Sequence, residues 1–210
     1  MFIDRTDAGR QLAKALSHYK GQPSVVFALP RGGVVLGVEV ARALDAPLDL
    51  IVVRKIGHPD QPEYAIGAVT ENGEWVLNSA EARSLDPNWI ADAARSGLLE
   101  AQRRRALYLR DRPSFTIKDK TAIVVDDGLA TGLTMEAALG ELRRRDPARI
   151  IVAVPVAAAE TLERLRPKAD DIVALHVPST FGAVGAFYRD FDQLDDDDVV
   201  RLLNSLEPDQ

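Results

Sequence analysis

The chain contains no cysteine in its 210 residues, and it has only three histidines. Without thiols it cannot form disulfides, thiolate metal sites or a cysteine nucleophile. The histidines, His18, His58 and His176, are scattered along the chain without the spacing of a metal-binding motif. We therefore expect neither cysteine chemistry nor a transition-metal site built by protein side chains.

Long apolar runs are also missing. No stretch approaches the roughly 20 apolar residues that span a membrane, and residues 1–7 do not resemble a signal peptide. The formal net charge of -6 argues against nonspecific nucleic-acid binding, which depends on cationic surface. With 46% hydrophobic and 28% charged residues, the composition is globular. We expect a cytoplasmic protein with a single domain over residues 1–210 and no membrane partner.

Apolar runs rich in β-branched residues alternate with helical patterns. Alternation of this kind predicts a doubly wound α/β fold, in which right-handed crossovers connect the strands of a parallel sheet. The predicted strands cover residues 24–29, 48–53, 121–125, 150–154 and 172–176, and the main helices begin near residues 6, 34, 134 and 160.

The alternation is interrupted between about residues 56 and 118. Within this insertion the turn Thr70-Glu71-Asn72-Gly73 contains Asn-Gly, a strong hairpin signal, and residues 65–69 and 74–77 flank it as strands. A helix is predicted from about 88 to 110. Such an insertion can form a mobile lid over an active site, a dimerisation arm, or both. We expect a homodimer.

Three runs of like charge have structural explanations. Residues 103–105 and 143–145 are arginine triplets in predicted helices with acids nearby, which indicates solvated helix faces or a subunit contact. The acidic run 195–198 precedes an apolar pattern. It is typical of a helix start, where the helix dipole favours acids, although a metal cluster is an alternative.

The most informative segment is residues 121–134, Thr-Ala-Ile-Val-Val-Asp-Asp-Gly-Leu-Ala-Thr-Gly-Leu-Thr. A buried-strand pattern leads directly into two carboxylates, at the sheet edge where parallel sheets bind ligands. Glycines then allow a tight loop whose amides, together with the hydroxyls of Thr131 and Thr134, can surround an anion at a helix N-terminus. A phosphate cradle beside Asp126 and Asp127 suggests a phosphorylated sugar, because its hydroxyls can donate hydrogen bonds to the carboxylates.

This segment resembles the motif of type I phosphoribosyltransferases that binds 5-phosphoribosyl 1-pyrophosphate (PRPP). The alternative is an ordinary strand that ends in two acids. Two other phosphate motifs do not fit, because Leu133 stands where a Walker A loop has lysine and the glycines lack dinucleotide-fold spacing. The defining positions are Asp126, Asp127, Thr131, Gly132 and Thr134, and the implied 5'-phosphate loop comprises Gly128, Leu129, Ala130, Thr131, Gly132, Leu133 and Thr134.

The resemblance implies a second loop that binds pyrophosphate. Residues Arg31, Gly32 and Gly33 follow the first strand, and the family often has a cis peptide that would fall between Arg31 and Gly32 here. Arg54 and Lys55 resemble a basic pair that approaches pyrophosphate oxygens. A plain strand-to-helix turn and a salt bridge to a helix are the respective alternatives.

The implied reaction transfers the phosphoribosyl group to a nitrogenous base or amine, as in nucleotide salvage, and releases pyrophosphate. Asp126 and Asp127 would hold the ribose hydroxyls and favour an oxocarbenium-like transition state, while Arg31 and Lys55 would stabilise the leaving group. Mg²⁺ is the implied cofactor, held mainly by PRPP and water. The 6-oxopurine branch has an acid where this chain has Ala130, so the acceptor stays open.

Acceptor recognition falls to a small C-terminal hood, about residues 177–210, in the family's arrangement. Its aromatic residues can stack on a base or simply pack in the core. Tyr64 and Glu63 of the insertion are further candidates. The hood candidates are Phe181, Phe187 and Tyr188, with Phe191 nearby.

Two functions other than transfer are compatible with the motif. A regulator could keep the fold and sense PRPP or a nucleotide without turnover. An accessory module similar to competence proteins could act through partners, but that class usually carries cysteine-rich metal-binding sequence, which this chain lacks.

Overall fold

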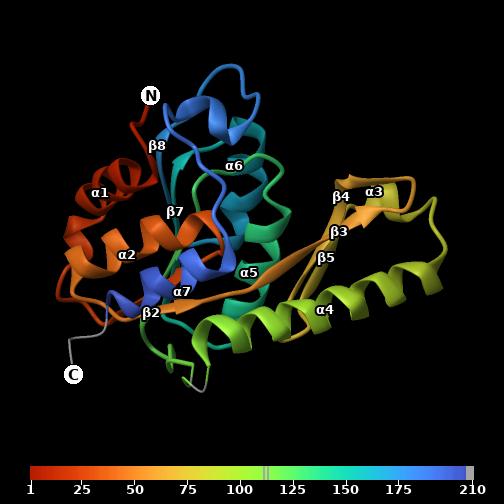
Figure 1. The fold of residues 1–210 in the computed structure, drawn as a ribbon, viewed down its shortest axis with the longest axis horizontal. Coiled ribbons are helices and arrows are strands. Elements are labelled where there is room, and N and C mark those ends of the chain that lie inside the picture. Colours follow the sequence, from red (N-terminus) through yellow and green to blue (C-terminus); the bar gives the residue numbers. More distant parts are fainter. Residues whose placement is uncertain (111, 113, 207–210) are drawn as a thin grey trace.

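A computed structural model describes residues 1–110, 112 and 114–206 of the chain (Figure 1). The predicted insertion and hood include residues 111, 113 and 207–210, and for those positions both predictions lie outside the described residues. Among the residues described, no helix is long and apolar enough to cross a membrane.

Five parallel strands form the central sheet, in the order β2-β1-β6-β7-β8. This confirms the predicted doubly wound parallel sheet. The order reverses between β1 and β6, so the loops after these two strands diverge and leave a crevice between them. The strands are β1 (Ser24–Ala28), β2 (Leu48–Leu50), β6 (Thr121–Val125), β7 (Arg149–Val156) and β8 (Asp171–His176).

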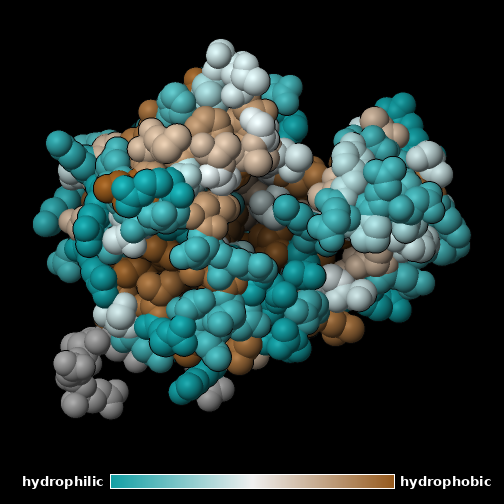
Figure 2. All heavy atoms as spheres, turned by 45° about the horizontal axis from the view of Figure 1, so that its top comes forward, coloured by the Kyte–Doolittle hydropathy of each residue, from teal (hydrophilic) through white to brown (hydrophobic). Residues whose placement is uncertain are grey.

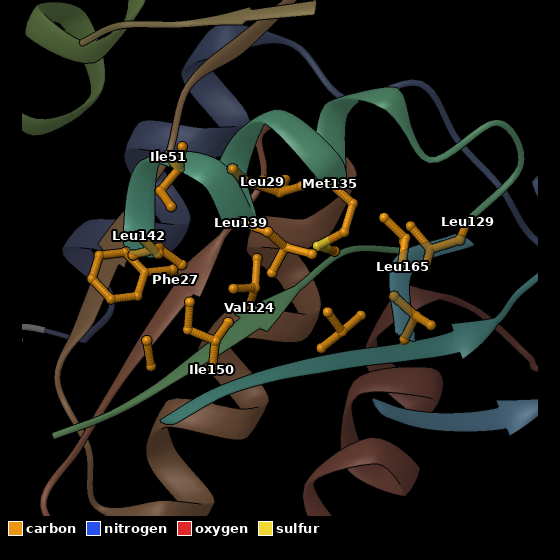
Figure 3. Close-up of a cluster of buried hydrophobic side chains, with 14 of the residues drawn as sticks. Phe27, Leu29, Ile51, Val124, Leu129, Met135, Leu139, Leu142, Ile150 and Leu165 are labelled. Carbon is orange, nitrogen blue, oxygen red and sulfur yellow. The ribbon is translucent and has the colours of Figure 1, made fainter. Parts of the chain in front are cut away.

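Helices cover both faces of this sheet because successive strand residues point to opposite sides. On one face Phe27 and Val124 pack with Leu139 of α5 (Figure 3). On the other face Val26 and Ile123 pack with α1 and α2. The helices are α1 (Arg5–Ala15), α2 (Gly32–Leu44), α5 (Leu133–Arg143), α6 (Ala159–Leu165) and α7 (Asp196–Asn204), with short 3₁₀ turns at Ser17–Tyr19, Arg166–Lys168 and Val184–Phe187.

The insertion forms an arm that projects from the body of the molecule (Figure 1). Three antiparallel strands are backed by a long helix, and an apolar cluster around Ile56, Ile66 and Val69 holds them together. The hairpin turn over residues 70–73 and the helix predicted for 88–110 are both confirmed. We use "arm" for β3 (Val53–His58), β4 (Gln61–Thr70), β5 (Trp75–Leu77), α3 (Ser79–Ala82) and α4 (Pro87–Leu109).

The strand predicted over residues 48–53 is wrong in extent, because the chain leaves the central sheet after Ile51. The Val52 amide donates to the Glu71 carboxylate at 2.7 Å, and the Glu71 amide donates to the Val52 carbonyl at 3.1 Å. These bonds turn the chain into β3 of the arm. Arg54 and Lys55 therefore lie inside an arm strand and do not end a core strand.

The acidic run near the C-terminus opens a helix, as predicted. Asp195 accepts a hydrogen bond from the Asp198 amide at 2.7 Å, and the Asp198 carboxylate accepts one from the Asp195 amide at 2.9 Å. This reciprocal capping box begins α7 and satisfies amides that have no partner within the helix.

A buried ionic cluster lies where the arm joins the body. Arg105 of α4 donates to Glu71 at 3.1 Å, to Asp49 at 3.1 Å and to the Leu50 carbonyl at 2.7 Å. Burial and the nearby charge of Glu141 nevertheless raise the pKa of Glu71 to about 8, because together they outweigh the attraction of Arg105.

Stability should therefore fall as pH rises towards 8. Folded protein keeps the Glu71 proton up to about pH 8, whereas the unfolded chain releases it near its ordinary pKa of 4.5. Between these values the folded state binds more protons, so the free energy of unfolding decreases by up to about 1.4 kcal/mol per pH unit from this group. Urea unfolding between pH 5.5 and 8 should show a flatter dependence for Glu71→Gln.

Glu163→Gln is the matched control, since Glu163 is an exposed acid on α6. Its pH dependence should match that of the wild type. An unchanged slope in Glu71→Gln would contradict the assigned protonation of Glu71.

Candidate active site

The loops that follow β1 and β6 face each other across the crevice where the strand order reverses. Together with one residue pair from β3 they line a cavity of about 250 Å³. Most of the predicted donor-site residues are therefore brought together. The cavity is lined by Leu29, Pro30, Arg31, Gly32, Val53, Lys55, Asp126, Asp127, Gly128, Leu129, Ala130, Thr131, Gly132, Thr134 and Val184.

The predicted phosphate loop is a turn between β6 and α5. Gly132 has a φ of 69°, which side chains rarely adopt, and it caps α5, whose first residue is Leu133. From behind the loop, Thr161 donates to the Ala130 carbonyl and Arg164 donates to the Thr131 carbonyl. These bonds use carbonyl oxygens that would otherwise repel an anion, so the loop can present amides and hydroxyls to the cavity.

Asp126 lies at the closed end of the cavity. Its surface opens only into that space, and its Oδ1 accepts a hydrogen bond from the Asp127 amide at 2.8 Å. Burial, followed by the adjacent charge of Asp127, raises the pKa of Asp126 well above its ordinary value, against the opposing charges of Lys55 and Arg5. Two neighbouring carboxyl groups in one enclosed site cannot both be ionised cheaply.

Asp127 is tied to residues far away in the sequence. Its Oδ2 accepts a hydrogen bond from Arg5 Nε at 2.8 Å, and its carbonyl oxygen accepts one from the Tyr188 hydroxyl at 2.7 Å. Arg5 is not among the site residues predicted from the sequence, and it precedes Asp127 by 122 positions. No local motif marks it, because α1 reaches the site only once the sheet has formed.

The first loop approaches the second closely enough to require glycine. A Cβ on Gly33 would lie 2.7 Å from the Val125 carbonyl oxygen, and one on Gly32 would lie 1.9 Å from Asp127 Oδ2. The cis peptide expected between Arg31 and Gly32 instead joins Pro30 to Arg31, one residue earlier.

The predicted basic pair is divided between the two faces of β3, because neighbouring strand residues point to opposite sides. Lys55 lines the cavity. Arg54 does not; it faces α4, where burial and then the charge of Arg104 lower its pKa. Arg54 thus lies outside the cavity, and Lys55 alone of the pair can contact a ligand there.

Arg31 lines the cavity and also reaches α7. Its Nη1 lies 3.9 Å from Asp196 Oδ1, which accepts a hydrogen bond from the Tyr108 hydroxyl at 2.6 Å. The acidic start of α7 therefore holds the arginine of the first loop, with Tyr108 of α4 completing the contact. The sequence pattern assigns Asp196 only to the helix start.

Among the predicted acceptor residues, Phe181 lines a second cavity of about 580 Å³ that adjoins the first through Ala130 and Thr131. Tyr64 of the arm lines it as well. Figure 2 shows the surface hollowed between the arm and the body of the molecule. This second cavity is placed to receive a molecule that meets the first cavity's ligand.

The other aromatic candidates support this region from within. Phe187 packs against His176 and Phe181, with ring centroids 5.7 and 5.4 Å apart. Tyr188 is only 5% exposed, and its hydroxyl holds the Asp127 carbonyl. Neither residue lines the two cavities, and Glu63 is exposed outside them.

Comparison with known proteins agrees with this geometry. A family model for the phosphoribosyl transferase domain matches residues 4–192. Two Mycobacterium tuberculosis proteins, MT0597 (strain CDC 1551 / Oshkosh) and Rv0571c (strain ATCC 25618 / H37Rv), are 44% identical over 206 residues, 97% of this chain and 46% of each relative. Their names propose phosphoribosyl transfer. The chain thus spans about half the length of these relatives.

The crystal structure of TT1426 from Thermus thermophilus is 45% identical, with a TM-score of 0.82 and coverage of 98% of both chains. The chain belongs to the phosphoribosyl transferase family. The resemblance to type I phosphoribosyltransferases drawn from residues 121–134 is confirmed, and so is the fold that it implied.

Gly32→Ala should destabilise the protein, because its methyl group would overlap Asp127 Oδ2 and displace the Arg5 contact. We expect a loss of about 1 to 3 kcal/mol in the free energy of unfolding, as for other overpacked sites. Urea denaturation at neutral pH measures this loss.

Gly182→Ala is the matched control, since a Cβ at Gly182 meets no atom within 4 Å. Its stability should stay within about 0.5 kcal/mol of the wild type. Equal stability of Gly32→Ala and Gly182→Ala would show that the first loop has room that the geometry denies it.

Proposed function

We propose that this domain transfers the phosphoribosyl group of PRPP to a nitrogenous acceptor and releases pyrophosphate. The observation that carries the proposal is a single cavity with two chemically different sides. One side offers carboxyl groups and a threonine-rich loop, and the other offers Arg31, two glycines and Lys55. PRPP has a matching division, with a ribose 5-phosphate at one end and a pyrophosphate at the other.

The loop over residues 128–134 would hold the 5'-phosphate through amides, the hydroxyls of Thr131 and Thr134, and the first turn of α5. Asp126 and Asp127 would meet the ribose hydroxyls. A protonated Asp126 can donate as well as accept a hydrogen bond, whereas an ionised Asp127 only accepts. Arg31 and Lys55 would contact pyrophosphate oxygens, supported by the Gly32 and Gly33 backbone.

Magnesium fits a role in which the substrate supplies most of the ligands. No group of three or more acidic or histidine side chains that could hold a metal occurs among the residues described. Asp127 Oδ1 faces no protein hydrogen-bond donor in the described structure, so it is a suitable contact for water on a magnesium-PRPP complex. When bound, Mg²⁺ would neutralise the charge of the departing pyrophosphate.

The reaction forms a bond between the acceptor nitrogen and the anomeric carbon and breaks the bond from that carbon to pyrophosphate, which leaves with the electron pair. Carboxyl groups beside the ribose favour the positive charge that develops on the ring. Ala130 cannot remove the acceptor's proton. An acceptor that is already nucleophilic, or that loses its proton to water, suits this site better than one that needs an acid at this position.

The second cavity would hold the acceptor. It adjoins the phosphate loop at Ala130 and Thr131 and is closed from one side by Tyr64 of the arm and from another by Phe181. Aromatic rings on two sides suit a flat heterocyclic base. Because the arm contributes Lys55 to one cavity and Tyr64 to the other, we propose that it acts as the catalytic lid.

The donor assignment can be tested by calorimetry of PRPP with Mg²⁺. Asp126→Asn combined with Asp127→Asn should weaken binding at least about tenfold, because hydrogen bonds to charged groups contribute roughly 1.5 to 3 kcal/mol. Asp170→Asn with Asp171→Asn is the control, a second acidic pair that lies at the amino end of β8. Equal PRPP affinity in the wild type and the Asp126/Asp127 variant would sink the site assignment.

Turnover is tested by pyrophosphate release with PRPP, Mg²⁺ and a panel of purines, pyrimidines and amines. We expect one class of acceptor to stimulate release. A protein that binds PRPP but releases no pyrophosphate with any acceptor would instead be a sensor of PRPP or nucleotides.

A further inference from the structure

The N-terminal segment is attached to the chain's last loop before α7. The Phe2 amide donates to the Phe187 carbonyl at 2.8 Å, and the amide of Arg189 donates to the Phe2 carbonyl at 2.9 Å. The Asp190 amide adds a bond to the Ile3 carbonyl at 2.9 Å. These backbone bonds fix the start of α1 beside the cavity, although the two segments lie at opposite ends of the domain sequence.

Arg5 stands at this junction and has a partner on every side of its guanidinium group. Its Nε donates to Asp127 Oδ2 at 2.8 Å, and its Nη1 donates to the Asp192 carbonyl at 2.7 Å. Its Cζ lies 3.7 Å from the centroid of the Phe191 ring, in a cation-π contact. Only 12% of the Arg5 side chain is exposed. An arginine held this closely has one orientation.

That orientation divides the work of the Asp127 carboxylate between its two oxygens. Oδ2 is packed between Arg5 and Gly32, where even a methyl group would not fit. Oδ1 has no hydrogen-bond donor among the described residues, while Asp127 itself lines the donor cavity. The arginine therefore leaves one carboxylate oxygen for a ligand and determines the direction in which it points.

We propose that Arg5 is a positioning residue that acts through Asp127, orienting the free oxygen and balancing the carboxylate charge beside a site for a phosphorylated ligand. The inference rests on the proposed binding of PRPP by this cavity. Without a neighbouring cation, an ionised Asp127 would repel the phosphates of that ligand. Arg5 offsets the repulsion without entering the cavity, since it is absent from the cavity lining.

Arginine and lysine should differ at this position. The two hydrogen bonds of Arg5 leave from different nitrogens of one rigid plane, and the same plane stacks on Phe191. A lysine can supply the charge to Asp127 but not both bonds and the stack together. Partial function of Arg5→Lys would separate the contribution of charge from that of geometry.

The first experiment compares PRPP affinity, by calorimetry with Mg²⁺, among Arg5→Gln, Arg5→Lys and Arg10→Gln. Arg10 lies on the same helix, is exposed and pairs with Glu39, so its replacement removes the same charge away from the site. We expect about a tenfold loss for Arg5→Gln, a smaller loss for Arg5→Lys and none for Arg10→Gln. Thermal melting confirms that each variant is folded.

The second experiment is a double-mutant cycle with Asp127→Asn. If Arg5 acts through Asp127, Arg5→Gln should weaken PRPP binding about tenfold in the wild-type background and less than about twofold in the Asp127→Asn background. A merely structural role would weaken binding similarly in both backgrounds, and that result would overturn the inference.

The two proposals fail in different ways. Should Asp127→Asn bind PRPP as tightly as the wild type, the donor site itself is wrongly assigned. Should Asp127→Asn lose affinity while Arg5→Gln retains it, the donor site stands and the role given to Arg5 is wrong. Should Arg5→Gln fail to fold, Arg5→Lys with the same cycle gives the decision.

Discussion

The site depends on an electrostatic constraint: two adjacent carboxyl groups must be held at the carboxyl end of β6, next to loops shaped for phosphates. Burial and mutual repulsion raise the pKa of Asp126, so one of the two charges is removed by a proton. The other is paired with Arg5 at 2.8 Å. Both solutions need elements from outside the local motif, and much of the surrounding architecture serves them.

Each of those elements is positioned by ordinary core packing. The sheet brings β1 and β6 side by side with aligned ends, from Ser24 opposite Thr121 to Ala28 opposite Val125. α1 and α2 share one apolar core with the same strands, which fixes Arg5 and the Arg31–Gly33 loop relative to Asp127. Precision at the cavity is thus inherited from close packing of the interior, which resists small displacements.

Local patterns predicted most of the fold and half of the site. Strand and helix periods indicated the parallel sheet, the Asn-Gly turn indicated the arm hairpin, and the motif around Asp126 indicated the phosphate loop. The sequence could not show that Glu71 would turn the chain out of the sheet after Ile51, or that this would place Arg54 on the outer face of β3. Arg5 was invisible for the same reason, since its partners are distant in sequence and no period or motif joins them.

The path of β3 has a mechanical consequence. Lys55 belongs to the arm, whereas Arg31, on the opposite side of the same cavity, belongs to the body and is anchored to the start of α7. The positive charge facing a departing pyrophosphate is therefore shared between two parts that meet at the buried Arg105 cluster. Any change in the angle of that joint alters the spacing of the two cations, so the site works as calipers whose setting depends on a hinge of buried ions.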